Sequence, residues 1–123
     1  MSFVPNPLHR PKVLPRPVPN QGEVDALAEA ARVRLDAEFG WVPESQRVNI
    51  IRLIVLIADE NRRSLNLPRG WVRSVMTILE DRGQPTTASS VRWYRSSIAA
   101  GLLDPVGDAG MDEDAVDWIM ERL

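Results

Sequence analysis

Apolar residues recur along most of this chain with the spacing of one face of an α-helix. From residue 23 to 39 they return at intervals of three and four, and the same spacing appears in 68–83 and 111–123. Residues 43–64 are apolar on nearly every side, which is typical of a helix with neighbours all round. Their β-branched run is compatible with a strand, but its length and polar breaks favour a helix. We therefore expect an all-α domain with a central helix at 43–64.

The two helices expected within residues 67–103 follow each other closely. The first ends at Gly83, and the second begins at Thr86 or Thr87, whose hydroxyl can accept a backbone N–H at a helix start. Two amphipathic helices with a short link are the layout of a helix-turn-helix DNA reader. We therefore predict a helix-turn-helix at about residues 67–103, inside a five-helix domain that spans residues 21–123.

The second of these helices, which we expect to end near Ala100, has two different faces. One face should pack on the core and consists of apolar residues: Ala88, Val91, Ile98 and Leu102. The other combines short polar groups with one cation and one aromatic ring: Ser89, Arg92, Trp93 and Ser96. Such a face suits a DNA groove better than open water.

Residues 1–20 hold six prolines. Because proline fixes φ and has no backbone N–H, we predict a Pro-rich, extended and flexible arm over these residues. It could follow a DNA backbone through Arg10, Lys12 and Arg16, or it could pack on its own domain or hang loose. A tether of this kind contributes little to a helical core, so we expect its removal to change stability little.

Composition excludes several kinds of chemistry. The chain has no cysteine, so disulfides, thiolate metal sites and cysteine nucleophiles are excluded. Its only histidine, His9, lies in the predicted arm, and no phosphate-binding glycine loop or zinc-protease motif is present. We therefore expect no enzyme activity, no metal and no cofactor. Because the N-terminal region lacks a signal peptide and no apolar run is long enough to span a bilayer, we also expect a cytoplasmic protein without membrane contact.

The net charge is −2, but its sign changes along the chain. Residues 61–103 carry seven arginines against Glu80 and Asp81, whereas residues 104–123 carry seven acids against Arg122. A basic segment between acidic ones can contact phosphates locally, since charges are screened beyond about 10 Å at ordinary salt. All but one of the 15 cations are arginine, which indicates a GC-rich genome; we interpret the source as a phage or an actinobacterium.

The predicted helix-turn-helix provides a set of expected DNA contacts. Its first helix should cross the backbone with Arg69 and Arg73 near phosphates. Its second helix should enter the major groove, where Arg92 can make a bidentate contact to guanine while Arg95 holds a phosphate. The other predicted DNA-binding residues are Thr87, Ser89, Ser90, Trp93 and Tyr94.

A family resemblance points the same way. The sequence VRWYR at 91–95, followed by GLLDP at 101–105, resembles the end of the recognition helix in MerR-type regulators and the related excisionases. Residues 96–100 lengthen the spacing found in that family. The resemblance implies that Arg92 and Tyr94 contact the DNA backbone.

Taken as a whole, the sequence favours a small transcriptional regulator that binds double-stranded DNA in a sequence-specific way. We expect a homodimer, because one reading helix provides little affinity and paired half-sites raise it. The last helix is the candidate dimer face, through Trp118, Ile119, Met120 and Leu123. The alternative is a protein-interaction module without DNA binding, for example a phage protein that binds a host factor through the acidic C-terminal helix.

Overall fold

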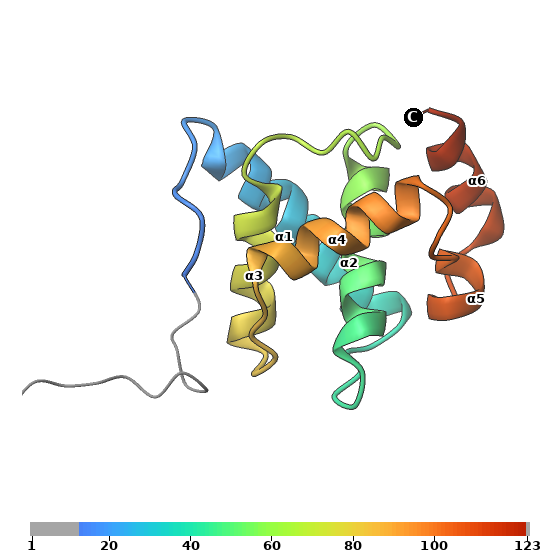
Figure 1. The fold of residues 1–123 in the computed structure, drawn as a ribbon, viewed down its shortest axis with the longest axis horizontal. Helices are drawn as coiled ribbons and strands as arrows, with labels where there is room; N and C mark the ends of the chain where they lie inside the picture. Colours follow the sequence, from blue (N-terminus) through green and yellow to red (C-terminus); the bar gives the residue numbers. More distant parts are fainter. Residues whose placement is uncertain (1–12, 123) are drawn as a thin grey trace, which may run out of the picture.

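The computed structural model describes residues 13–122, which fold into a helical bundle (Figure 1). This part of the chain contains no strand, so the predicted all-α class is confirmed. Its six helices are α1 (Gln21–Glu38), α2 (Gln46–Glu60), α3 (Trp71–Asp81), α4 (Ala88–Ala99), α5 (Pro105–Ala109) and α6 (Glu113–Glu121).

The central position predicted for α2 is confirmed. This helix contacts each of the other five, and Figure 1 shows α4 crossing over it. From Ile50 to Ala58 every side chain except that of Arg52 is buried. Each fully buried isoleucine or leucine stabilises the fold by about 1.5–3 kcal/mol relative to an exposed one. The core of the domain is therefore assembled around α2.

The bounds of α2 are narrower than the predicted 43–64. At its start the Ser45 hydroxyl accepts a hydrogen bond from the Val48 N–H at 3.2 Å, which satisfies a donor that the helix cannot pair. Beyond its end, Arg62 and Arg63 have φ angles of 56° and 58°. This left-handed backbone is incompatible with a continuing right-handed helix. The loop that follows leads to α3, which is also shorter than predicted.

The prediction of five helices was wrong, because α5 forms where only a connection was expected. The Asp104 side chain accepts a hydrogen bond from the Val106 N–H at 3.0 Å, and Pro105 occupies the first turn, where proline needs no donor. The Arg52 side chain of α2 donates from Nε to the Ala109 carbonyl at 2.9 Å. Helix α5 is too short to be stable alone, and it is held by the Asp104 cap at its start and by the Arg52 hydrogen bond at its end.

The prediction that Leu102 packs in the core was also wrong. Its side chain is 78% exposed, whereas the neighbouring Leu103 is buried. The reason lies in the turn after α4, where Gly101 has a φ of 75° and changes the direction of the chain. The other apolar positions predicted for this helix behave as expected, since Val91 and Ile98 are buried and Ala88 packs against the core.

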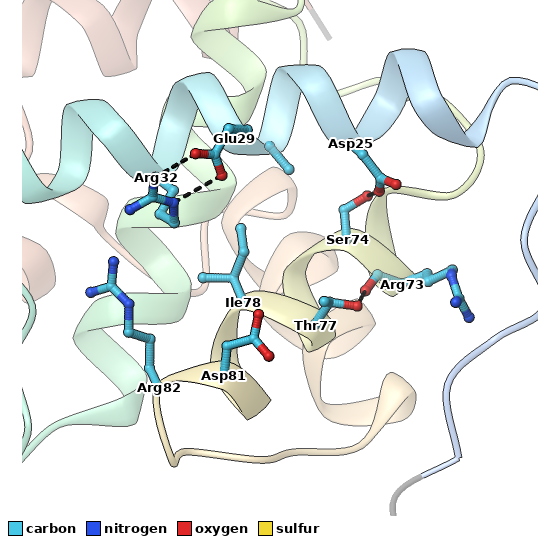
Figure 2. Close-up of a pocket in the computed structure, with 10 residues that line it drawn as sticks. Asp25, Glu29, Arg32, Arg73, Ser74, Thr77, Ile78, Asp81 and Arg82 are labelled. Carbon is cyan, nitrogen blue, oxygen red and sulfur yellow. Dashed lines mark hydrogen bonds and ion pairs between the residues drawn. The ribbon is translucent and has the colours of Figure 1, made fainter.

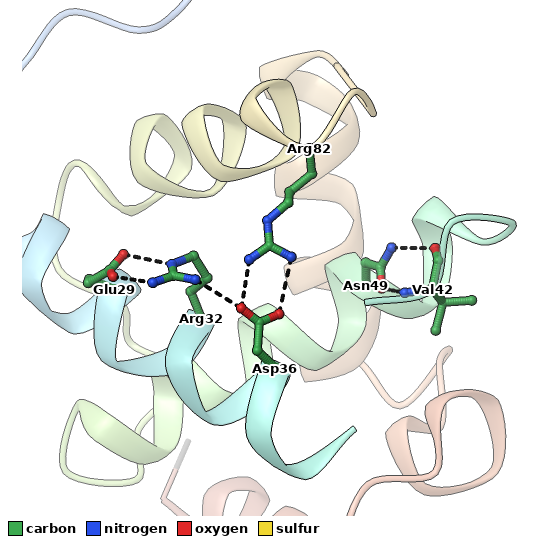
Figure 3. Close-up of polar contacts among 6 residues, drawn as sticks. All are labelled: Glu29, Arg32, Asp36, Val42, Asn49 and Arg82. Carbon is green, nitrogen blue, oxygen red and sulfur yellow. Dashed lines mark hydrogen bonds and ion pairs between the residues drawn. The ribbon is translucent and has the colours of Figure 1, made fainter. Parts of the chain in front are cut away.

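Side-chain amides join the α3–α4 link to the start of α2. The Asn49 side chain is fully buried; it donates to the Val42 carbonyl at 2.8 Å and accepts from the Val42 N–H at 3.0 Å (Figure 3). It also donates to Gln84 Oε1 at 2.9 Å. Gln46 donates to the carbonyls of Gln84 at 2.6 Å and Pro85 at 3.1 Å. The link over residues 82–87 is therefore held against the start of α2.

An ion-pair network strengthens the same region (Figure 3). The Arg82 guanidinium at the end of α3 makes two hydrogen bonds to the Asp36 carboxylate of α1, at 2.7 and 3.1 Å. It also lies 5.0 Å from the centre of the Trp41 ring. Arg32 donates to Asp36 at 2.9 Å and pairs with Glu29. The hydrogen bond from Arg82 lowers the pKa of Asp36 below its ordinary value, because it favours the ionised carboxylate.

Part of the predicted arm lies on the domain. Residues 13–18 form neither helix nor strand, and Leu14 packs against the core. The Arg73 guanidinium of α3 donates to the Pro15 carbonyl at 2.8 Å. Residues 1–12, including His9, Arg10 and Lys12, lie outside the described residues, as does Leu123.

Replacement of Asn49 tests the importance of its buried amide. We expect Asn49→Ala to lower the free energy of unfolding by about 1–3 kcal/mol, because the Val42 N–H loses its partner in a partly buried position. Urea unfolding followed by circular dichroism measures the change. Asn20→Ala is the control, because Asn20 precedes α1 without a side-chain capping bond. Equal losses in the two variants would contradict the prediction.

The Asp36–Arg82 pair should make stability depend on acid pH. Because the folded-state pKa of Asp36 is lowered, its contribution is present at neutral pH and is lost as pH falls below about 4. We expect Asp36→Asn to cost about 0.5–1 kcal/mol at pH 7 and less as the pH falls and the carboxylate is protonated. Thermal melts across this range measure it, with Asp117→Asn on the exposed side of α6 as control. A difference that persists unchanged at pH 2 would rule out the ion pair as its cause.

Candidate nucleic-acid interface

Two adjoining hollows lie where the first turn of α3 meets α4. The larger has a volume of about 420 Å³ and includes residues of the N-terminal segment, the start of α3 and Arg92 of α4. The smaller, of about 270 Å³, includes Asn66, Arg95 and Ser96. Trp71 and Arg92 line both. Segments far apart in the sequence therefore meet at one surface.

This surface is strongly cationic. The residues that line the two hollows include no aspartate or glutamate but five arginines: Arg16, Arg69, Arg73, Arg92 and Arg95. Within residues 13–122 none of these five forms an ion pair. Of the eight other arginines in the described chain, Arg52, Arg62 and Arg122 also form none, and five do: Arg32, Arg34, Arg47, Arg63 and Arg82. Grouped cations without counter-charges raise the local concentration of anions.

Two of the five arginines are held by neutral backbone groups. Arg73 Nη1 donates to the Pro15 carbonyl at 2.8 Å, and Arg95 Nε donates to the Leu65 carbonyl at 3.0 Å. A carbonyl accepts a hydrogen bond without cancelling the positive charge. These bonds therefore orient two guanidinium groups while leaving them attractive to an anion.

A glycine at the start of α3 shapes the larger hollow. Gly70 has a φ of 101°, and a Cβ atom there would lie 2.7 Å from Gln21 Oε1 and 2.9 Å from Val18 Cγ2. The buried Gln21 side chain donates to the Gly70 carbonyl and to Ser74 Oγ, each at 3.0 Å. The missing side chain at position 70 thus allows the N-terminal segment and α1 to approach α3 closely.

The predicted outward face of α4 is confirmed. Ser89, Arg92 and Ser96 are exposed, and Trp93 is 53% exposed. Trp93 contacts Tyr94 edge to face, with ring centres 5.2 Å apart, and Tyr94 packs against the core. This face therefore presents polar groups, one cation and one ring to the outside of the domain.

The start of α4 has a structural task of its own. Thr87 is its N-cap, one of the two positions predicted, and its hydroxyl accepts a hydrogen bond from the Ser90 N–H at 3.1 Å.

The predicted DNA-binding residues fall into two groups. Four line the hollows: Arg69, Arg73, Arg92 and Arg95. The others lie on α4 or at its start: Thr87, Ser89, Ser90, Trp93 and Tyr94.

Sequence reasoning missed Trp71 as part of this surface. Its side chain is only partly buried and lines both hollows. No local pattern marks this position, because the hollows also involve the N-terminal segment and Arg92, which are distant in the sequence. Arg16 was expected in the arm, which could follow a DNA backbone, pack on its own domain or hang loose; it lines the larger hollow.

A third hollow, of about 430 Å³, lies between α1 and α3 (Figure 2). Its charged lining residues are of both signs: Asp25, Glu29, Asp81, Arg32, Arg73 and Arg82. Figure 2 shows Glu29 paired with Arg32, and Ser74 donates to Asp25 at 2.6 Å. Across the described residues no group of three or more His, Asp or Glu side chains could hold a metal ion. This hollow is therefore less suited to an anion than the cationic surface.

Comparisons with protein-family models, curated proteins and solved structures found no match. In the described part of the chain, none of the helices combines the length and the apolar character needed to cross a membrane. The geometry and charge of the cationic surface are therefore the features that bear on function.

The role of Gly70 can be tested with a matched pair of substitutions. We expect Gly70→Ala to lower the free energy of unfolding by about 1–3 kcal/mol, because the new methyl group meets Gln21 and Val18 and the backbone is left-handed. Gly22→Ala is the control, since a methyl group added at this position of α1 would have no neighbouring atom within 4 Å. It should be neutral or stabilising by up to about 1 kcal/mol. Chemical denaturation of both variants decides whether space at position 70 matters.

Proposed function

We propose that this protein is a non-enzymatic, sequence-specific double-stranded DNA-binding protein that acts as a small transcriptional regulator. One observation carries the proposal. Five arginines without ion pairs in the described chain surround two hollows beside the exposed polar face of α4. DNA supplies closely spaced phosphates to such a surface and base edges to such a helix face.

The two groups of residues suit two kinds of contact. Arg69, Arg73 and Arg95 would bind phosphates, which provide much of the affinity but no sequence information. Arg92 is exposed on α4 and belongs to both hollows, so it would contact guanine or an adjacent phosphate. Thr87, Ser89, Ser90, Trp93 and Tyr94 would complete the contacts along α4.

The support of α4 favours a helix-turn-helix role. Helices α3 and α4 contact each other, and the link between them is fixed to α2 by Gln46 and Asn49. A helix that reads DNA must be held rigidly, since small displacements lose base contacts. The resemblance of residues 91–105 to MerR-type regulators supports the same role.

The proposal includes a cytoplasmic homodimer that binds two half-sites. The apolar stripe of α6 is used within the chain, because Val116 and Ile119 are buried in its own core. Trp118 is 48% exposed, and the Arg63 guanidinium lies 4.8 Å from the centre of its ring. Of the dimer face predicted on α6, the Trp118 side is therefore the part left for a partner.

A protein-interaction module is the second candidate. Its support is the exposure of Trp93, Leu102 and Trp118, together with the acidic C-terminal region. Salt separates the two functions. Binding through phosphates weakens steeply as salt rises, whereas binding through an apolar protein interface does not.

Substitution of Arg92 tests the proposed reading helix. We expect Arg92→Ala to keep the fold, because the side chain is exposed and alanine favours a helix. Its affinity for a selected duplex should fall by about tenfold, or about 1.4 kcal/mol. Selection from a random duplex library, followed by fluorescence anisotropy on the selected site, measures the loss.

Arg122→Ala is the matched control, because it removes the same charge from the exposed end of the chain beyond α6. It should change affinity by less than about twofold at moderate salt. Failure of the wild-type protein to select or bind any duplex would refute the proposed function. Equal affinities of wild-type protein and Arg92→Ala would refute α4 as the reading helix.

A further inference from the structure

We propose that the larger hollow is a phosphate-binding site and that residues 13–18 form one of its walls, with Arg16 as a ligand. The site would bind a phosphate group of the DNA backbone through four guanidinium groups: Arg16, Arg69, Arg73 and Arg92. This inference rests on the proposed function. It extends that function by assigning to the N-terminal segment a part of the site that α3 and α4 alone do not provide.

The N-terminal segment is held against α3 at several points. Leu14 packs on the core, and the Pro15 carbonyl accepts a hydrogen bond from Arg73 at 2.8 Å. Val18 lies beside Gly70, and its N–H donates to Gln21 Oε1 at 3.4 Å. Arg16 lies between these contacts and lines the hollow. Its position at the surface is therefore determined by the fold.

The chemistry of the hollow matches a phosphate. The four arginines come from three separate parts of the chain, and the described residues supply no acid to the lining. Guanidinium groups bind phosphate oxygens through pairs of parallel hydrogen bonds. The first turn of α3 also lines the hollow. The Trp71 N–H donates to the Pro68 carbonyl at 3.2 Å, but the N-cap, Gly70, has no side chain to bond the N–H groups of Val72 and Arg73. Such N–H groups add to the attraction for an anion.

The position of this hollow separates anchoring from reading. Ser89 and Trp93 on the outward face of α4 do not line it, whereas Arg16, Arg69 and Arg73 do. A phosphate bound there would hold the protein on any duplex, with Arg92 connecting the two regions. Loss of Arg16 should therefore weaken binding to all sequences by a similar factor.

The first experiment uses pyrophosphate and the four tryptophans of the full-length chain. Each indole N–H gives one signal in a nitrogen–proton correlation spectrum, and single Trp→Phe variants assign them. Addition of sodium pyrophosphate at constant ionic strength should shift the Trp71 signal in a saturable way. Trp118, at α6, should stay unchanged, because it does not line the hollow.

Variants of Arg16 connect this signal to the N-terminal segment. We expect Arg16→Ala to weaken pyrophosphate binding by about threefold or more, and Arg16→Lys to weaken it less, since the charge is kept. Arg122→Ala should leave it unchanged. In DNA titrations at several salt concentrations, Arg16→Ala should lower affinity for unrelated duplexes equally and reduce the salt slope by about one.

The results separate this inference from the proposed function. If pyrophosphate leaves Trp71 unshifted, or if Arg16→Ala binds it as wild type does, the phosphate site is refuted. Pyrophosphate binding that depends on Arg16, without any duplex binding, would support the phosphate site and refute DNA as its ligand. DNA binding that is insensitive to Arg16 would keep the proposed function and remove the N-terminal segment from the site.

Discussion

The buried amide of Asn49 is the constraint on which the arrangement of the helices depends. An unpaired polar group in the core costs about 1–3 kcal/mol, so its hydrogen bonds to Val42 and Gln84 must form together. Satisfying them brings the α1–α2 link and the α3–α4 link to the same end of α2. Apolar packing alone is not directional, and α2 is apolar on nearly all sides. The amide therefore selects one arrangement of the links among those that would bury α2 equally well.

The cationic surface follows from that arrangement. With the α3–α4 link fixed, the start of α3 and the middle of α4 face a common space, and Arg69, Arg73 and Arg92 meet there. None of the three forms an ion pair in the described chain, although residues 104–123 carry seven acids. Helices α5 and α6, with the residues that flank them, carry those acids, and both helices contact α2. None of these acids lines the two hollows.

Much of the fold could be predicted from the sequence, because helical spacing and caps are local properties. The central helix, the Thr87 cap and the outward face of α4 are examples. Helix α5 was missed because Pro105–Ala109 is too short to show a period. Leu102 was misplaced because Gly101 ends the helical register. At the candidate site, four arginines could be named in advance. The contacts of Arg16 and Trp71 could not, since they join segments about 50 residues apart, beyond any local pattern.

The left-handed residues after α2 have an evolutionary consequence. Such a backbone costs a non-glycine residue about 1–2 kcal/mol, and Arg62 and Arg63 both adopt it. Arg63 has compensating contacts, to Asp59 at 3.4 Å and to the face of the Trp118 ring. Arg62 has no ion pair among residues 13–122. Selection should therefore act differently on these two positions. Position 62 should drift toward glycine or asparagine. Position 63 should keep a cation for as long as position 118 stays aromatic.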